Sequence, residues 1–223
     1  MAKRKTPDKS FNQWTQQQVE KTFGLVLLEN HPLLQTWLDI ALPAELEISI
    51  HELAILKELQ KVAKIFVESW TEQEMVMKYV SFITTFAHLS RQNYQTFADR
   101  SLSVQVGNEK LFGQVDFMVA SGRYEPEAPY FCFHEYKRAK PGHESDPVGQ
   151  LLATMLAAQA LNESKQPIYG AYIIGKFWQF VILEHQEYAI SKSYDSTDEP
   201  LWDIMRILKG LNLLIPAMIE GRR

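Results

Sequence analysis

Hydrophobic positions along the chain change their spacing near residue 90, from a helical period of about 3.6 to a strand period of two. Before that point the pattern predicts a helix over 11–38 with a break or a new start at Pro32, a second over 51–70, and a third from Thr71 to about Leu89. Thr71 and Glu74 fit a capping box that begins the third helix. The stretch 39–50 fits either a short strand or a connector.

Alternating apolar residues then predict three strands, over 94–106, 110–120 and 129–138. The tetrapeptide "GNEK" at 107–110 is typical of a tight turn, so the first two strands should form an antiparallel hairpin. An alanine- and leucine-rich helix over 146–164 follows, with Pro147 suited to its first turn. Strands at 167–175, 177–184 and 188–192 and a last helix over 200–218 complete the chain.

This order of elements predicts an α/β protein with a mixed central sheet flanked by helices, together with an N-terminal helical extension and a C-terminal helix. We expect residues 1–68 to hold a basic tail and the extension. Residues 69–223 should hold the core and the last helix.

Composition narrows the class of protein further. The net charge of −4 argues against a protein that coats nucleic acid, so any such contact must come from a local patch. The single cysteine, Cys132, excludes an internal disulfide and a zinc site built from several thiolates. No apolar run is long enough to span a membrane, and no apolar segment follows the basic N-terminus as in a secretory signal. These features predict a soluble cytoplasmic protein.

Three charged residues on predicted strands suggest chemistry. Asp116 lies in the middle of "GQVDFMV", and Glu135 and Lys137 end the next strand in "FCFHEYK". Residues two apart on a strand share a face, so Glu135 and Lys137 should project together, with Asp116 beside them on a neighbouring strand. Two carboxylates and the backbone carbonyl of Tyr136 suit Mg²⁺, which prefers oxygen ligands. Lys137 is then placed to orient a water or to stabilise charge on a phosphate.

Other interpretations of these residues stay open at this point. Glu135 and Lys137 also fit a solvated pair at a strand end, and Asp116 fits a buried carboxylate bonded by backbone amides. Phe177 and Trp178 fit either the core or a base-stacking surface.

Three short motifs carry a resemblance to a known family. They are "GQVD" with Gly113 and Asp116, "EYK" with Glu135 and Lys137, and "GQLLA" with Gln150. Together they are similar to the motifs of the PD-(D/E)XK nuclease superfamily. The resemblance covers roughly residues 71–190 and rests on the order of the elements that carry the motifs.

Two positions depart from that family's pattern. Val115 replaces the proline of the family's name. Thr154 stands where RecB-like members carry a tyrosine four residues after the glutamine.

The resemblance implies a restriction endonuclease-like αβββαβ core and a Mg²⁺-dependent nuclease that cleaves DNA, with Mn²⁺ as a substitute. By similarity, Asp116 and Glu135 are metal ligands, Lys137 is the catalytic lysine, and Gln150 joins the site, although a solvent-facing position also fits Gln150. A glutamate of the first core helix often joins the metal in this family, and Glu72 is the first choice here. Glu74 is the second, because the capping box already explains it.

Contacts to nucleic acid are expected from basic residues near the site. Surface positions also fit these side chains, and the predicted contacts are Arg138, Lys140, His143 and Lys176. The sequence is compatible with a homodimer or with a subunit of a larger complex. The alternative function is a catalytically inactive nuclease fold that serves as an interaction module in a restriction, repair or defence complex.

Overall fold

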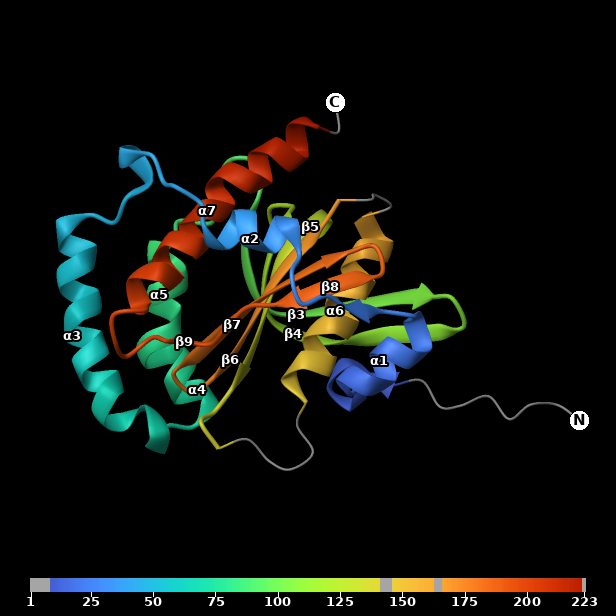
Figure 1. The fold of residues 1–223 in the computed structure, drawn as a ribbon, viewed down its shortest axis with the longest axis horizontal. Helices are drawn as coiled ribbons and strands as arrows, with labels where there is room; N and C mark the ends of the chain where they lie inside the picture. Colours follow the sequence, from blue (N-terminus) through green and yellow to red (C-terminus); the bar gives the residue numbers. More distant parts are fainter. Residues whose placement is uncertain (1–8, 141–145, 163–165, 222–223) are drawn as a thin grey trace, which may run out of the picture.

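The computed structural model describes residues 9–140, 146–162 and 166–221 of the 223-residue chain. Within these residues it shows an α/β protein with a nine-stranded mixed sheet flanked by helices (Figure 1). The strand order is β1-β4-β5-β6-β7-β8-β2, with β3 also paired to β4 and β9 to β7. The strands are β1 Lys9–Ser10, β2 Val26–Leu27, β3 Gln95–Val106, β4 Glu109–Ser121, β5 Glu127–Lys137, β6 Ile168–Ile174, β7 Phe177–Glu184, β8 Glu187–Ile190 and β9 Tyr194–Asp195.

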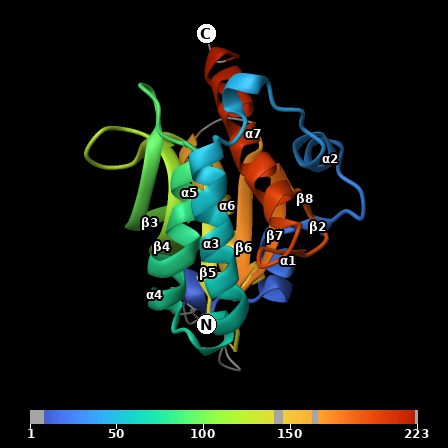
Figure 2. The same ribbon diagram turned by 90° about the vertical axis from the view of Figure 1, so that its left-hand side faces the viewer.

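Helices cover both faces of this sheet and divide the core into two clusters. One face packs against α6 and the N-terminal segment, by which we mean residues 9–27. The other face packs against α2, α3, α7 and the helix that runs from α4 to α5 (Figures 1 and 2). The helices are η1 Phe11–Gln13, α1 Gln16–Phe23, α2 Pro32–Leu38, η2 Ala44–Leu46, α3 Ile50–Phe66, η3 Val67–Ser69, α4 Glu72–Met75, η4 Val76–Val80, α5 Ser81–Phe86, α6 Pro147–Asn162 and α7 Leu201–Glu220.

The central strands confirm the predicted order of elements. β3 and β4 form an antiparallel hairpin around Gly107, whose φ of 60° suits glycine in a tight turn. β5 then pairs antiparallel with β4, and α6 carries the chain across one face so that β6 lies parallel to β5. Such a crossover needs a helix-length connection, which the residues between Lys137 and Ile168 provide.

The helix expected over residues 11–38 is wrong. The structure instead has η1, α1, the short strand β2 and α2 in this stretch. Gly24, at φ 70°, ends α1 in the left-handed conformation, and the chain then extends so that Val26 and Leu27 pair with β8. Pro32 begins α2, as one of the two expectations for it stated. Of the stretch 39–50, residues 39–49 are a connector with one 3₁₀ turn and no strand, and Ile50 already belongs to α3.

The helix that begins after Thr71 contains a π-helical segment that its sequence pattern does not reveal. The capping box of Thr71 and Glu74 is confirmed. The π-helical turn η4 then widens the helix over Val76–Val80, between the α-helical segments α4 and α5. Single π-helical turns inside α-helices are frequent at functional sites.

The first 68 residues and the rest of the chain share one sheet. β1 pairs with β4 and β2 pairs with β8, so both strands of the N-terminal segment extend the central sheet. Trp37 of α2 is fully buried, and its ring lies 5.1 Å from that of Phe180 on β7. The proposed boundary at residue 68 stays a prediction, but residues on both sides of it build the same core.

In the part of the chain that the structure describes, no helix combines the length and the apolar character needed to cross a lipid bilayer.

Close packing of the N-terminal segment on α6 gives a first testable prediction. A Cβ at Gly149 would lie 2.4 Å from the backbone oxygen of Trp14, and Asp146 accepts hydrogen bonds from the backbone N–H groups of both Gln16 and Gly149. We expect Gly149→Ala to lower the free energy of unfolding by about 1–3 kcal/mol, because backbone must move to admit the methyl group. Urea denaturation measures this change, and wild-type stability in the variant would contradict the described packing.

Candidate active site

β4 and β5 separate at the position where the predicted charged residues lie. Their pairing runs as far as Phe117 and His134 and stops there, although β4 stays paired with β3 and β5 stays paired with β6. Asp116 and Glu135 are the next residues on the two strands. We call residues 113–116 of β4 and 135–137 of β5 the strand fork.

Asp116 bridges the two strands across the strand fork. Its Oδ2 accepts a hydrogen bond of 2.8 Å from the backbone N–H of Tyr136. The expectation that a backbone amide bonds this carboxylate is therefore confirmed. Burial raises the pKa of Asp116, and the Tyr136 amide and the Lys137 charge oppose that shift. The cost of burying the carboxylate therefore exceeds the stabilisation that its hydrogen bond and the lysine charge provide.

Glu135 and Lys137 project to the same side of β5, as the strand period predicts. Lys137 Nζ donates to a carboxylate oxygen of Glu135. Glu135 is only 3% exposed, so the solvated strand-end interpretation is wrong for this residue. Burial raises the pKa of Glu135 to about 8; Asp116 adds to the shift and Lys137 opposes it.

The Lys137 ammonium collects three oxygen groups. Besides Glu135 it donates to the backbone carbonyl of Tyr136 at 3.1 Å, and it lies 3.9 Å from Oε2 of Glu72. Two of these groups, the Glu135 carboxylate and the Tyr136 carbonyl, are the ones predicted to hold a metal ion. The third, Glu72 of α4, lies near Lys137, and its role as a metal ligand stays a prediction.

The N-terminus of α4 decides which glutamate faces Lys137. Glu74 is used locally, because it accepts from the backbone N–H of Thr71 and pairs with Lys78 at 2.7 Å. Glu72, two residues earlier, is partly exposed and has a pKa raised by burial, with Lys137 opposing. The preference for Glu72 over Glu74 therefore agrees with the geometry.

An open cleft of about 340 Å³ lies beside the strand fork. Asp116 and the first turns of the α4–η4 helix border it. Asp99 of β3 also borders the cleft, and it was not among the residues predicted from the sequence. Asp99 has φ 52°, a left-handed conformation that aspartate tolerates better than most residues, and its charge raises the pKa of Asp116. Its signal in the sequence was the one that revealed Asp116, a charge inside a predicted strand. The cleft is lined by Glu72, Gln73, Val76, Met77, Ala98, Asp99, Asp116 and Tyr136.

Gly113 of the "GQVD" motif has a packing reason to be glycine. Its φ is 148°, and a Cβ there would lie 2.9 Å from the ring of Phe11. Phe11 is buried and belongs to the segment that follows β1. The N-terminal segment thus packs directly on the strand fork.

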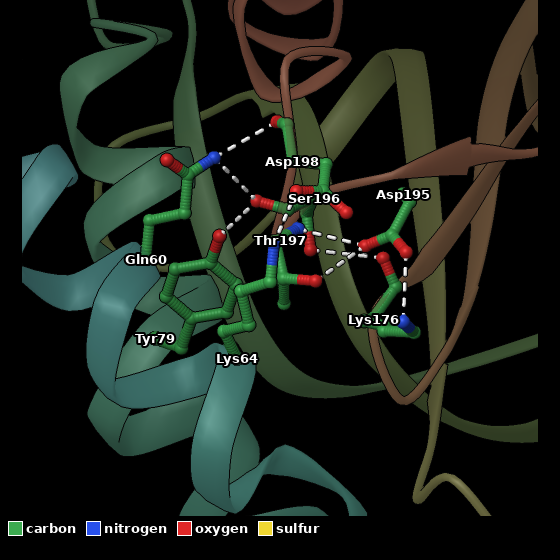
Figure 3. A network of polar contacts seen from close by, with 8 residues as sticks. All are labelled: Gln60, Lys64, Tyr79, Lys176, Asp195, Ser196, Thr197 and Asp198. Atoms are coloured by element: carbon green, nitrogen blue, oxygen red, sulfur yellow. Dashed lines mark hydrogen bonds and ion pairs between the residues drawn. The ribbon is translucent and has the colours of Figure 1, made fainter.

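Of the basic residues predicted to contact nucleic acid, some are exposed and one already pairs with a carboxylate of the protein. Arg138 and Lys140 are exposed just beyond β5, and the Arg138 charge acts to lower the pKa of Glu72. Lys176 instead pairs with Asp195 at 2.8 Å, within the polar network of Figure 3. His143 lies outside the described residues. Phosphate binding by these residues stays a prediction.

Gln150 lies on α6 and is 9% exposed, so the solvent-facing interpretation is wrong. No hydrogen bond among the described residues joins its side chain to the strand fork, and its catalytic role stays a prediction. Trp178 on β7 is fully buried, which confirms the core interpretation for that ring, whereas Phe177 is 44% exposed.

The donor set of the strand fork suits a hard cation that keeps water ligands. In the described parts of the chain, no group of three or more His, Cys, Asp or Glu side chains is placed to hold a metal ion. Mg²⁺ is ordinarily held by one or two carboxylates with water completing its shell, so Asp116, Glu135 and the Tyr136 carbonyl fit that ion. Around these groups carboxylates also outnumber cations, since Glu72 and Asp99 add negative charge.

Comparison with known protein families finds no family that matches the chain, and comparison with curated proteins finds no relative.

The ion pair at the strand fork gives a second prediction. We expect Lys137→Met to destabilise the protein by about 1–3 kcal/mol in chelator-treated buffer, because it leaves the buried Glu135 carboxylate without its cation. Glu135→Gln should cost less, since Lys137 can still reach water. In a double-mutant cycle by urea denaturation, the pair should show a coupling of about 1 kcal/mol or more. Strictly additive effects would show that the two side chains do not depend on each other.

Proposed function

We propose that this protein is a metal-dependent phosphodiester hydrolase, a nuclease, with the strand fork as its active site. The observation that carries the proposal is that Asp116, Glu135 and Lys137 meet where two central strands separate, beside an open cleft. A buried carboxylate pair with a lysine is costly to stability, and such arrangements are typical of functional sites.

The order of elements around the site supports the finer assignment. A helix bearing Glu72, the three strands β3 to β5, the crossover helix α6 and the strand β6 follow one another as in the αβββαβ core of PD-(D/E)XK nucleases. Asp116 and the Glu135–Lys137 pair lie on the second and third of those strands. We therefore infer a restriction endonuclease-like core.

Each group at the site has a distinct task in this proposal. Asp116, Glu135 and the Tyr136 carbonyl would hold Mg²⁺ or Mn²⁺, with Glu72 beside them. When bound, such an ion lowers the pKa of a water and offsets charge on a phosphate oxygen. Lys137, whose ammonium contacts Glu135 and the Tyr136 carbonyl, would orient the attacking water or donate a hydrogen bond to a phosphate oxygen.

Two cations that follow the strand fork along the chain suit an extended polyanion as substrate, with a divalent cation offsetting the carboxylates of the cleft. Arg138 and Lys140 are exposed immediately after the catalytic strand and can contact phosphates on either side of the cleaved bond. The protein as a whole carries a net charge of −4, so binding depends on this local patch and should weaken with salt. We propose DNA as the substrate because the resemblance of the motifs points to it.

A second candidate, the catalytically inactive interaction module, is favoured by one observation. Lys137 already bonds Glu135 and the Tyr136 carbonyl, so these two oxygen groups are satisfied by the protein's own cation. A site that serves only to hold the fold together needs nothing more.

Cleavage assays test the proposed reaction. Plasmid DNA, single-stranded DNA and RNA are incubated with the protein and with Mg²⁺ or Mn²⁺. We expect the wild type to cleave DNA, and Asp116→Asn and Lys137→Ala to lose at least about 100-fold in rate, as expected when a group that stabilises developing charge is removed.

Lys192→Ala, which removes an exposed lysine distant in sequence, should keep full activity. Equal rates for wild type and Lys137→Ala, or cleavage by neither, would contradict the catalytic proposal.

Metal-linked stability separates the two candidate functions. A ligand at 100 times its Kd stabilises the folded state by about 2.7 kcal/mol, so Mn²⁺ should raise the melting temperature of the wild type. Asp116→Asn should lose that increase, and Glu187→Gln, at an exposed carboxylate of β8, should keep it. An inactive module predicts no increase in any of the three proteins.

A further inference from the structure

A second cavity lies away from the strand fork and is lined by residues of α3, α7 and the connector that leads into α3. Its volume is about 390 Å³, within the range of small-molecule sites in proteins. It shares no lining residue with the cleft beside Asp116. Its apolar walls are Leu42, Ile48, Leu53, Trp202 and Met205.

One helical face of α7 contributes both apolar and cationic groups to this cavity. Met205 and Arg206 lie three and four residues after Trp202, and Lys209 lies four and three residues after them, so the four residues share a face of the helix. Lys57 of α3 adds a cation, and Glu47 is the one carboxylate among the lining residues. The lining is therefore apolar with an excess of positive charge.

Lys209 is the unusual member of this set. It is 3% exposed, and no hydrogen bond or ion pair holds its ammonium among the residues that the structure describes. The acid whose charge acts on it is Glu52, but both Glu52 oxygens are engaged, one by the backbone N–H of Ser49 and one by His88. A mostly buried lysine whose ammonium has no direct hydrogen-bond partner is costly, and an anion in the cavity would supply that partner.

The other two cations are placed differently. Arg206 donates to the carbonyls of Leu38 and Ile40 and to Asp203, so the fold already uses its guanidinium. Lys57 is exposed and solvated at the rim. Lys209 is thus the cation of this lining that is mostly buried and has no direct hydrogen-bond partner among the described residues.

We propose that this cavity binds a small amphipathic monoanion, a molecule with an apolar body and one carboxylate-like head group directed to Lys209. The apolar walls take the body of the ligand, and the ammonium takes its charge. This site is separate from the proposed nuclease site and stands whether or not the protein cleaves nucleic acid.

Isothermal titration calorimetry with sodium decanoate and with its uncharged analogue 1-decanol tests the proposal. The wild type should bind one decanoate. It should bind 1-decanol at least about tenfold more weakly, because the alcohol cannot accept a charge-assisted hydrogen bond through a carboxylate. Lys209→Met should weaken decanoate binding about tenfold and leave 1-decanol unchanged. Lys110→Met, which removes an exposed charge on β4, should bind decanoate like the wild type.

Lys209→Met should fold at least as stably as the wild type, because it removes a buried charge. Leu42→Trp provides a second test that leaves α7 intact, since the larger ring fills the cavity and should abolish binding of both ligands. The proposal is overturned if neither ligand binds the wild type, if both bind equally well, or if Lys209→Met or Leu42→Trp keeps wild-type affinity for decanoate.

Discussion

The separation of β4 from β5 is the constraint on which the candidate site depends. Where two strands stay paired, their backbone N–H and C=O groups bond one another and are not free to bind other groups. Beyond Phe117 and His134 the pairing stops, and the Asp116 carboxylate takes up the backbone N–H of Tyr136 in place of a strand partner. The same carboxylate thereby lies beside Glu135 and Lys137. The loss of strand pairing leaves the Tyr136 N–H without a backbone partner, and the Asp116 carboxylate that replaces this partner is held at the site.

Neighbouring elements hold the strand fork open. β3 remains paired along the far edge of β4, and β6 remains paired along β5, so the strands can diverge without losing the rest of the sheet. The N-terminal segment packs close by, with β1 on Leu111 and Phe112 and the ring of Phe11 against Gly113. The α4–η4 helix supplies the opposite wall of the cleft and brings Glu72 to Lys137. The N-terminal segment therefore belongs to the architecture of the site.

The sequence predicted the central elements well because each has a clear period. The hairpin of β3 and β4, strand β5, α6 and α7 follow directly from alternation, helical spacing and turn residues. The N-terminal stretch was mistaken for one helix because β2 is only two residues long and is stabilised by β8, a partner about 160 residues away. A short strand that depends on a distant partner leaves almost no local signal.

The site shows the same division between local and distant information. Strand period alone placed Glu135 and Lys137 on one face, and the charge within an apolar strand revealed Asp116. Glu72 was named as a candidate only through the resemblance of the motifs. Asp99 carried the same signal as Asp116 and was overlooked, and the cleft beside the strand fork shows the two carboxylates as neighbours. The extent of burial of Glu135 was also beyond the sequence, because a strand end is exposed or covered according to what packs over it.

The central claim is that Asp116 and Glu135 together hold a divalent cation at the strand fork. Diffraction from a crystal soaked in Mn²⁺, recorded near the manganese absorption edge, locates such an ion directly. We predict an anomalous peak about 2.1–2.3 Å from oxygens of both Asp116 and Glu135, close to the Tyr136 carbonyl, with Lys137 moved off that carbonyl. A map with no peak there, and with Lys137 still bonded to Glu135 and the Tyr136 carbonyl, would contradict the account.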